Sequence, residues 1–408
     1  MERVVVTGMG GLCALGDQWD QIEAAMNAGR NAVRVMPDWD RYTELNTRLA
    51  APLPAFSPPS HWTRKQLRSM GRVSQLAVCA AERALADAGL LGDESISDGR
   101  MGVACGSSTG STAEVRAFGN MLLNGVTDDL NANSYVRMMP HTTAANIGIF
   151  FSLKGRVIPT SSACTSGSQG IGYAFEAIRY GRQALMLAGG AEELCASEAI
   201  VFDALYATSQ KNHSPELTPR PYDRSRDGLV IGEGAGMLVL ESLSHAQARG
   251  ARIHAELVGF GCNSDGTHIT RPEAVTMRIA MAQALADAGL PPEAIGYVNG
   301  HGTATEHGDI AETLATHALF GPRAMISSQK SYLGHTLGAC GALESWFSIE
   351  MLKAGRYAPT LNLCDVDPLC GDLDYIMGTT RHAEVEYVMN NNFAFGGINT
   401  SLIFRRWP

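Results

Sequence analysis

The heptapeptide ALADAGL occurs twice in the chain, at Ala84–Leu90 and again at Ala284–Leu290. In both copies a helical pattern ends at Ala-Gly, and a strand-like run follows, MGVACG in the first case and IGYVNG in the second. Each half then has a Ser-Ser pair after a strand, a glycine-rich turn and a helix that ends in glycine. This shared order indicates an internal duplication, with halves of about 1–250 and 251–408.

The rest of the chain alternates strand-like and helical patterns. Aliphatic and β-branched runs such as RVVVTG, ALMLAGG and AELVGFG are broken by glycine. Such runs are typical of strands that are buried on both faces because helices cover both sides of the sheet. The sequence therefore predicts an α/β fold made of two related halves. If these halves pair across a pseudo-twofold axis, their equivalent strand-to-helix turns face each other.

Composition limits the classes of function. The 408 residues have a formal net charge of −9, which argues against a nucleic-acid partner. No apolar run approaches the roughly 20 residues that span a bilayer, and MERVVVTGMG enters a strand pattern directly, so we expect neither a membrane segment nor a leader. Nine cysteines without CxxC pairs or Cys/His zinc spacing fit a reducing compartment. We therefore expect a cytoplasmic protein without a metal site.

One cysteine differs from the others in its surroundings. In SSACTSGSQG, residues 161–170, Cys164 follows a strand-like run and precedes a glycine-rich turn into a helix. Free N–H groups and the positive end of the dipole at a helix N-terminus stabilise a thiolate. The remaining cysteines are interpreted as small buried hydrophobic residues. We predict that Cys164 is a nucleophile.

Three later segments place further reactive side chains beside glycines. NGHGTATEHGD carries His301 at the end of a strand. KSYLGHTLGACGALE carries Lys330 and His335 across a glycine turn, with Glu344 in the following helix. NNNFAFGGINTSL places two phenylalanines beside a Gly-Gly pair, which is typical of a flexible apolar flap. The four segments together predict one composite catalytic site.

These segments resemble the β-ketoacyl-acyl-carrier-protein synthases of the elongating type I/II group, in the thiolase-like superfamily. The resemblance runs from VVVTGMG through RPYDRSRDGLVIGEGAG to NNFAFGGINTSLIF. It implies a duplicated, five-layered α-β-α-β-α fold, which agrees with the repeat. It also implies the reaction: the cysteine takes an acyl chain from the phosphopantetheine of an acyl-carrier protein, and malonyl-carrier protein loses CO2 and attacks that thioester. The product is a 3-oxoacyl chain two carbons longer, and no cofactor beyond the 4'-phosphopantetheine of the carrier protein is expected.

The resemblance assigns a role to each matching residue. Cys164 is the nucleophile, and His301 and His335 stabilise the charge that develops on the malonyl thioester oxygen. Lys330, paired with Glu344, positions His335. The further assignments are the backbone N–H groups of Cys164 and Phe395 as the oxyanion hole, Phe395 with Phe393 as the gatekeeper, Thr303 and Thr305 as pantetheine ligands, and Arg64, Lys65 and Arg68 as the docking face for the acidic carrier protein.

The resemblance also bears on assembly and metals. Family members are usually homodimers with the active sites near the interface, and a heterodimer with a related chain-length subunit is the alternative. We expect the carrier protein to act in trans. Asn299, Glu344, Asn390 and Asn391 match positions where some relatives hold a structural cation, but we predict none here.

Some departures from the family pattern concern the product. FAFGG has Ala394 where the family flap has glycine, and CTSGSQG and the bulky Tyr332 of KSYLGHT differ from the usual segments of housekeeping members. They favour a specialised pathway with a polyene or polyketide-like product over bulk fatty acids. Chain length and unsaturation stay open.

Two other functions are open from the sequence. GSSTG at Gly106–Gly110 follows a strand and matches the G-x-S-x-G nucleophile elbow, which would make Ser108 the nucleophile of an acyl (thio)ester hydrolase. The chain would otherwise be a non-catalytic chain-length partner subunit. Such relatives have lost the nucleophile, so the presence of Cys164 argues against this role.

Overall fold

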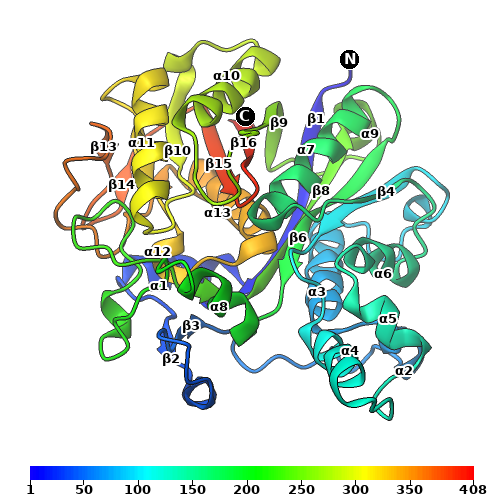
Figure 1. The fold of residues 1–408 in the computed structure, drawn as a ribbon. Coiled ribbons are helices and arrows are strands. Elements are labelled where there is room, and N and C mark those ends of the chain that lie inside the picture. The colour runs from blue at the N-terminus through cyan, green and yellow to red at the C-terminus, as the bar shows by residue number, and fades with distance from the viewer.

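Eleven strands form one mixed sheet through the centre of the computed structural model, which describes residues 1–408 (Figure 1). Their order is β5-β4-β6-β8-β1-β9-β16-β15-β10-β11-β13. The N-terminal part contains β1 (Val4–Cys13), β4 (Met101–Gly106), β5 (Val157–Pro159), β6 (Leu185–Glu192) and β8 (Gly234–Ser242). The C-terminal part contains β9 (Ala255–Ser264), β10 (Ile295–Asn299), β11 (Met325–Ser327), β13 (Asp374–Tyr375), β15 (Tyr387–Ala394) and β16 (Ile398–Arg406).

The two parts have matching strand orders on either side of the β1–β9 pair. Counted outward, β1, β8, β6, β4 and β5 correspond to β9, β16, β15, β10 and β11. β1 and β9 join the parts through a short antiparallel ladder, in which Val4–Val6 lie opposite Ala255–Leu257. Residue 250, the predicted end of the first half, lies between α9 (Leu243–Ala248) and β9.

Helices on three levels complete the layers. α3 (Arg72–Asp87) packs on the outer face of the N-terminal part, and α10 (Ala274–Ala288) with α11 (Glu306–Phe320) covers the outer face of the C-terminal part. α7 (Ser166–Arg179) and α13 (Cys340–Ala354) lie between the two parts and contact each other. The predicted α-β-α-β-α order is confirmed, and the two copies of ALADAGL end α3 and α10, which hold corresponding positions.

Glycines allow the two central helices to approach closely at their N-terminal ends. A Cβ atom on Gly341 would lie 2.7 Å from the backbone nitrogen of Ser168, and one on Gly167 would lie 2.9 Å from that of Ala342. Contacts this short exclude any side chain at either position. The start of α7 and the start of α13 therefore meet, as the duplicated turns predict.

The remaining elements surround this frame. No helix combines the length and apolar composition that a membrane crossing needs. Helices α2, α4 and α5 gather at the lower right of the molecule (Figure 1). The bounds of these elements are α1 (Trp19–Asn27), α2 (Arg64–Leu67), α4 (Thr112–Asn124), α5 (Ala132–Met138), α6 (Thr142–Phe150), α8 (Ala196–Asp203), α12 (Lys330–Leu333), β2 (Arg34–Val35), β3 (Leu49–Ala51), β7 (Ile231–Gly232), β12 (Arg356–Tyr357) and β14 (Arg381–His382).

Candidate active site

Cys164 lies in a one-turn 3₁₀ helix, η3 (Ala163–Thr165), immediately before α7. Ala163 has a φ of 51°, a left-handed conformation that is unusual for a residue with a Cβ atom. The turn is held by its own side chains: the Ser166 hydroxyl donates to the carbonyl of Ala163 at 2.7 Å, and the Thr165 hydroxyl to that of Ser162 at 2.8 Å. This local network fixes the Cys164 thiol at the start of a buried helix.

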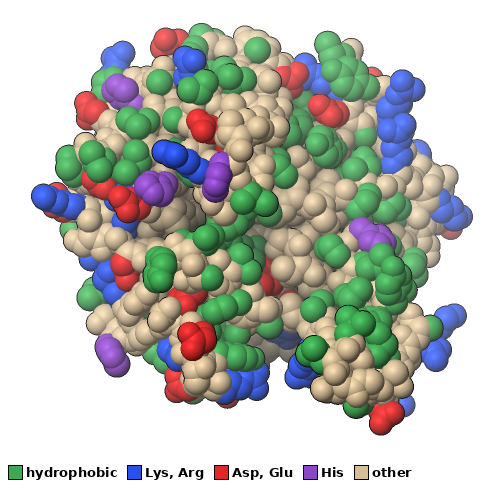
Figure 2. Space-filling model, viewed as in Figure 1, with side chains coloured by type: hydrophobic (Ala, Val, Ile, Leu, Met, Phe, Trp, Pro, Cys, Tyr) green, Lys and Arg blue, Asp and Glu red, His purple; other side chains and the backbone are tan.

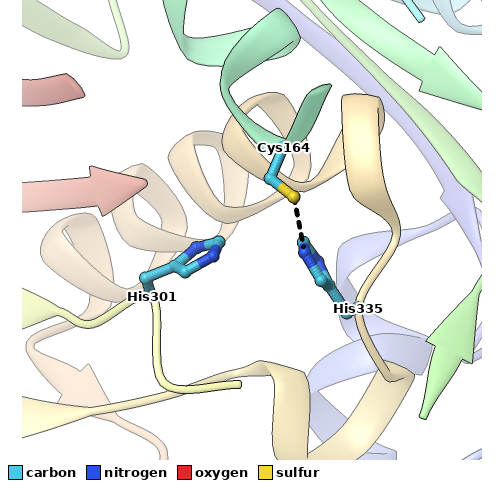
Figure 3. A group of neighbouring side chains, drawn as sticks. All are labelled: Cys164, His301 and His335. Carbon is cyan, nitrogen blue, oxygen red and sulfur yellow. Dashed lines mark hydrogen bonds between the residues drawn. The ribbon is translucent and has the colours of Figure 1, made fainter. Parts of the chain in front are cut away.

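His335 comes from the corresponding turn of the second half. Its backbone N–H donates to the carbonyl of Val230 at 2.7 Å, and its carbonyl accepts from Gly232 at 2.9 Å. These bonds anchor the segment between α12 and the one-turn helix η6 (Leu337–Ala339). The ring Nε2 then lies 3.0 Å from the sulfur of Cys164 (Figure 3). The predicted pairing of the two turns thus brings the thiol and the imidazole into contact.

His301 follows β10 and approaches from the other side (Figure 3). The Glu312 carboxylate accepts the backbone N–H of His301 at 2.5 Å and that of Gly302 at 2.7 Å, which fixes the loop. The rings of His301 and His335 are 5.1 Å apart and nearly perpendicular, at 88°. The sulfur of Cys164 and one nitrogen of each ring all lie within 4.8 Å of one another. Three predicted residues therefore form a single cluster.

A buried ion pair lies behind the histidines. Lys330 Nζ is 2.5 Å from Glu344 Oε1, and both side chains are 1% exposed. Burial would lower the pKa of Lys330, but the Glu344 carboxylate raises it, so the ammonium stays charged. Burial first, and then the Lys330 charge, hold the pKa of both His301 and His335 well below the usual value. Both imidazoles are therefore neutral near pH 7.

Burial dominates the protonation state of Cys164. Burial raises the pKa of its thiol to about 12, and the Lys330 charge and the backbone N–H of Phe395 offset only part of this effect. The helix start favours the thiolate, but desolvation outweighs that effect. The thiol must lose its proton during attack, and Nε2 of His335 is the adjacent acceptor.

A cavity of about 460 Å³ opens onto the cluster. Cys164 and both histidines line it, together with Thr303, Thr305, Phe393 and Phe395. The hydroxyls of the two threonines are 2.9 Å apart, on the segment that follows His301. The cavity thus contains the predicted pantetheine ligands and the predicted gatekeeper beside the thiol.

Phe395 lines this cavity next to Phe202 of α8. Its ring is 4.8 Å from that of Phe202, measured between centroids. Gly396 and Gly397 follow with φ values of 88° and 71°, which favour glycine. Ala394 belongs to the same apolar cluster as Cys164. The predicted flap therefore packs directly over the nucleophile.

The predicted docking residues are not part of this cavity. Arg64 and Lys65 are on α2, and Arg68 caps its C-terminal end. All three side chains are exposed and none forms a salt bridge. Arg137 of α5 adds a neighbouring guanidinium, which donates to the carbonyl of Arg68 at 2.6 Å. α2 lies at the lower right of the molecule in Figure 1, and Lys and Arg side chains lie along that edge in Figure 2.

Ser108 is not placed as a hydrolase nucleophile. Its hydroxyl donates to the Glu192 carboxylate at 2.5 Å, and no imidazole accepts from it. The Ser108 hydrolase hypothesis is therefore wrong: the GSSTG loop follows β4 as predicted, but its serine binds a carboxylate.

Sequence reasoning missed the residues that hold the cluster in place. Glu312 anchors His301, Glu192 anchors the η6 turn by accepting from Gly338 N at 2.9 Å, and Asn392 donates to the second oxygen of Glu344 at 2.7 Å. Local sequence does not distinguish a buried carboxylate from a solvent-exposed one when its hydrogen-bond partners are distant in the chain.

Each of the four residues that match a cation position in some relatives contacts protein groups, but the side-chain oxygens of Asn299 and Asn391 are buried without a hydrogen-bond partner. The Asn299 amide donates to Asn390 Oδ1 at 2.8 Å, and the Asn390 amide donates to Gly341 and Ser345. The Asn391 amide lies against the sulfur of Met281, and Glu344 binds Lys330 and Asn392.

Comparisons with known proteins agree with this geometry. The chain matches two family models, the β-ketoacyl synthase N-terminal domain over residues 1–246 and the β-ketoacyl synthase C-terminal domain over residues 254–364. The chain belongs to the β-ketoacyl synthase family. The synthase is 37% identical to 3-oxoacyl-[acyl-carrier-protein] synthase 2 of Vibrio cholerae, over 99% of both chains.

Solved structures resemble the synthase over its whole length. It is 66% identical to a β-ketoacyl synthase from Burkholderia phymatum, with a TM-score of 0.99 and 100% of both chains covered. A second solved structure is a type II PKS acyl-carrier protein in complex with its ketosynthase bound to the hexaketide. The synthase is 30% identical to a chain of that complex, with a TM-score of 0.88 and 100% of both chains covered. The synthase is therefore a condensing enzyme with the thiolase-like fold.

Proposed function

We propose that this β-ketoacyl synthase condenses an acyl-Cys164 thioester with malonyl-acyl-carrier protein. The reaction releases CO2 and gives a 3-oxoacyl-acyl-carrier protein two carbons longer. The observation that carries the proposal is the Cys164 thiol 3.0 Å from the Nε2 of one neutral imidazole, with a second neutral imidazole perpendicular to the first.

The first half-reaction is acyl transfer. The Cys164 sulfur attacks the incoming thioester while its proton passes to His335 Nε2, the C–S bond to pantetheine breaks, and the departing thiolate takes up the proton. The backbone N–H groups of Cys164 and Phe395 are close enough to interact with the sulfur, so they are well placed to stabilise the oxyanion.

The second half-reaction is decarboxylation and attack. The malonyl C–CO2 bond breaks, and its electron pair forms an enolate on the thioester carbonyl. A neutral imidazole can donate one N–H, so His301 offers one hydrogen bond to that oxygen. His335, whose Nε2 no longer accepts from a thiol once Cys164 is acylated, offers a second in the tautomer protonated at Nε2, and the nearby Lys330 charge favours the enolate. The enolate carbon then attacks the acyl-Cys164 carbonyl, a C–C bond forms, and the acyl C–S bond breaks. The Cys164 sulfur leaves as a thiolate, which takes up a proton from water.

The substrates enter through the cavity. We assign the hydroxyls of Thr303 and Thr305 to the pantetheine arm because they line the passage to Cys164. Phe395 and Phe202 of α8 line the same cavity with their ring centroids 4.8 Å apart, and we assign this apolar wall to the acyl chain. The chemistry calls for no cofactor beyond the 4'-phosphopantetheine that carries the substrates.

An acyl-carrier protein in trans is the proposed partner. Arg64, Lys65 and Arg68 are exposed cations without acidic partners on a chain of net charge −9, so they suit an acidic partner. The similarity to a ketosynthase solved with its carrier protein supports this assignment.

A homodimer is the proposed assembly. β5 is the outermost strand of the sheet, and Val157 in it is 49% exposed. Leu122 and Leu123 of α4 are 78% and 84% exposed. Hydrophobic side chains gather over α4 in Figure 2. An edge strand and exposed leucines each favour pairing with a second copy. Native mass spectrometry distinguishes this dimer from one with a separate chain-length subunit.

A specialised pathway is the proposed setting. Of the departures from the common pattern, Ala394 stands in the flap and lines the cavity, and Tyr332 is fully buried on α12, the helix that carries Lys330. We further propose a cytoplasmic location, which the nine free cysteines favour.

Intact-protein mass spectrometry tests the function. The protein is incubated with acyl-carrier protein bearing a labelled acyl chain and then with malonyl-carrier protein. We expect an acyl adduct on Cys164 and a 3-oxoacyl product two carbons longer. Cys164→Ala abolishes the adduct, whereas Cys340→Ala, which removes a thiol 3.2 Å from the Cys164 carbonyl, retains it. Free acid without chain extension, or an adduct on another residue, contradicts the proposal.

A further inference from the structure

Two buried glutamates that have no role in the proposed reaction lie behind the Cys164 turn. Glu192 ends β6 and is 0% exposed, and Glu198 is on α8 and is 2% exposed. Neither forms a salt bridge with a lysine, arginine or histidine. Two buried carboxyl groups without a counter-ion raise the question of which of them is ionised.

Hydrogen-bond donors identify Glu192 as the carboxylate. It accepts the backbone N–H of Ser108 at 2.8 Å and that of Gly338 at 2.9 Å, and neither group can act other than as a donor. The hydroxyls of Ser107 and Ser108 also donate to it, at 2.8 Å and 2.5 Å. Burial raises the pKa of Glu192, but these four donors oppose that effect, whereas the pKa of Glu198 is raised well above its usual value.

Thr109 determines the state of Glu198. Its hydroxyl oxygen is 3.1 Å from Glu192 Oε1 and 2.9 Å from Glu198 Oε1. A hydroxyl has one proton, so it can donate to only one of the two oxygens. If Thr109 donates to the Glu192 carboxylate, the proton in the second contact must come from Glu198. The chain of bonds then runs from the Glu198 carboxyl O–H to Thr109 and from the Thr109 O–H to Glu192.

The surroundings of Glu198 agree with a neutral acid. Burial, and next the Glu192 charge, raise the pKa of Glu198 well above its usual value. The titratable groups that face it are Glu192 from β6 and Cys195 at the N-cap of α8, and neither supplies positive charge. The second carboxyl oxygen accepts the backbone N–H of Cys195 at 3.2 Å.

This chain of bonds connects two sides of the nucleophile. Glu192 holds Gly338 and so the η6 turn that follows His335, and its charge is felt by Cys164, whose pKa it raises. Glu198 is on the helix whose Ala199 belongs to the apolar cluster around Cys164. Loss of the Glu198 proton would break the bond to Thr109 and place a second negative charge beside Glu192.

We propose that Glu198 is a positioning residue that works as a neutral carboxylic acid, holding Glu192 and the η6 turn in register with Cys164 through Thr109. The inference rests on the proposed function in one respect: the η6 turn is taken to position His335 for condensation. Removal of the proton above neutral pH therefore lowers the reactivity of Cys164. An amide at position 198 keeps both hydrogen bonds, because its NH2 group donates to Thr109 and its oxygen accepts from Cys195, and it does not titrate.

The test compares Glu198→Gln with Glu198→Ala over pH 6 to 10. The readouts are kcat for condensation and the rate of Cys164 alkylation by iodoacetamide, which needs no carrier protein. We expect the alanine variant to lose at least tenfold in kcat at pH 7 and the glutamine variant to restore most of that loss. We also expect the ratio of alkylation rates, Glu198→Gln over wild type, to rise several-fold as pH increases.

Glu193→Gln is the matched control. Glu193 is the adjacent buried glutamate, but two backbone N–H groups, from Val73 and Thr112, donate to its two oxygens at 3.0 Å and 2.8 Å. An amide at position 193 would direct its NH2 group at one of these backbone N–H groups, so we expect this variant to be less stable. We expect no change in the pH dependence of Cys164 alkylation.

Two outcomes would overturn the inference. One is a glutamine variant as impaired as the alanine variant, which would mean that Glu198 acts as a carboxylate. The other is identical pH dependence of alkylation in wild type and Glu198→Gln. If the alanine variant does not fold, the pH comparison of the glutamine variant still decides. Absence of condensation with the expected alkylation profile would refute the proposed function and leave this inference standing.

Discussion

Removal of the Glu344 carboxylate tests the role of the buried ion pair directly. Glu344→Gln leaves the Lys330 ammonium, 1% exposed, without its counter-charge at 2.5 Å. Breaking a buried pair by removing one partner costs about 3–5 kcal/mol, because an uncompensated charge stays in the interior. We therefore expect the free energy of unfolding at pH 7 to fall by about that amount, with loss of condensing activity.

The pH dependence of this deficit has a defined sign. In the wild type the pKa of Lys330 is raised above 10.5 by Glu344, despite burial, so its contribution persists below that pH. In the variant the effect of Glu344 is lost, so burial, the largest effect, depresses the pKa of Lys330 in the folded state and only Cys340 and Glu312 oppose it. The unfolded chain then binds more protons than the folded chain, so stability rises with pH, by up to about 1.4 kcal/mol per unit, until pH 10.5. The difference from wild type should therefore narrow between pH 7 and pH 10.

Urea unfolding followed by tryptophan fluorescence measures both effects. The matched control is the double variant Lys330→Met/Glu344→Leu, which removes both charges and should recover most of the stability without activity. A Glu344→Gln deficit below about 1 kcal/mol at pH 7 would refute the reasoning. So would a deficit of equal size at pH 7 and pH 10, or a double variant less stable than the single one.

Three further predictions concern other parts of the site. Gly341→Ala should lower the free energy of unfolding by about 1–3 kcal/mol and reduce kcat, because the new Cβ would lie 2.7 Å from Ser168 N. Thermal unfolding measures the change in stability. Gly119→Ala in α4, where nothing lies within 4 Å of the new Cβ, is the control and should be neutral or stabilising. Ala394→Gly should speed acylation of the nucleophile and alter the chain-length profile, both followed by mass spectrometry; an unchanged rate and profile would show that the flap does not control entry. Burial raises the pKa of Glu312 to about 7, so wild type loses stability as pH rises from 4.5 through 7, and Glu312→Gln should remove roughly 3 kcal/mol of that pH dependence in unfolding titrations.

Local patterns in the sequence predicted the frame and the reacting groups well. The two copies of ALADAGL do end corresponding helices, and the Ser-Ser turns do meet, so Cys164 and His335 are brought into contact. These features could be predicted because adjacent residues determine a turn, a glycine position and the start of a helix. The same locality misled at Ser108, where the short GSSTG pattern has the right neighbours but the wrong partner.

Properties that depend on the assembled fold were not accessible. The thiol of Cys164 is protonated at rest because layers distant in sequence bury it, and no local pattern records that burial. Glu192 reaches Gly338 across 146 positions, so its role has no trace near either residue. The joining of both halves into one sheet depends on the short β1–β9 ladder, which resembles any other pair of apolar runs in the sequence.

The two matching turns differ in what occupies them. Ala163 precedes Cys164 with a φ of 51°, and Leu337 precedes Gly338 with a φ of 44°, so Gly338 is the counterpart of the nucleophile. A Cβ at position 338 would lie 2.8 Å from a Glu192 oxygen, and the Gly338 N–H donates to that same oxygen. Main-chain N–H groups around an oxygen anion are what an acyl-transfer site offers its intermediate. At the Gly338 turn, N–H groups therefore bind a permanent carboxylate of the protein. At the matching Cys164 turn, the corresponding N–H groups bind a negatively charged oxygen that exists only during one catalytic step.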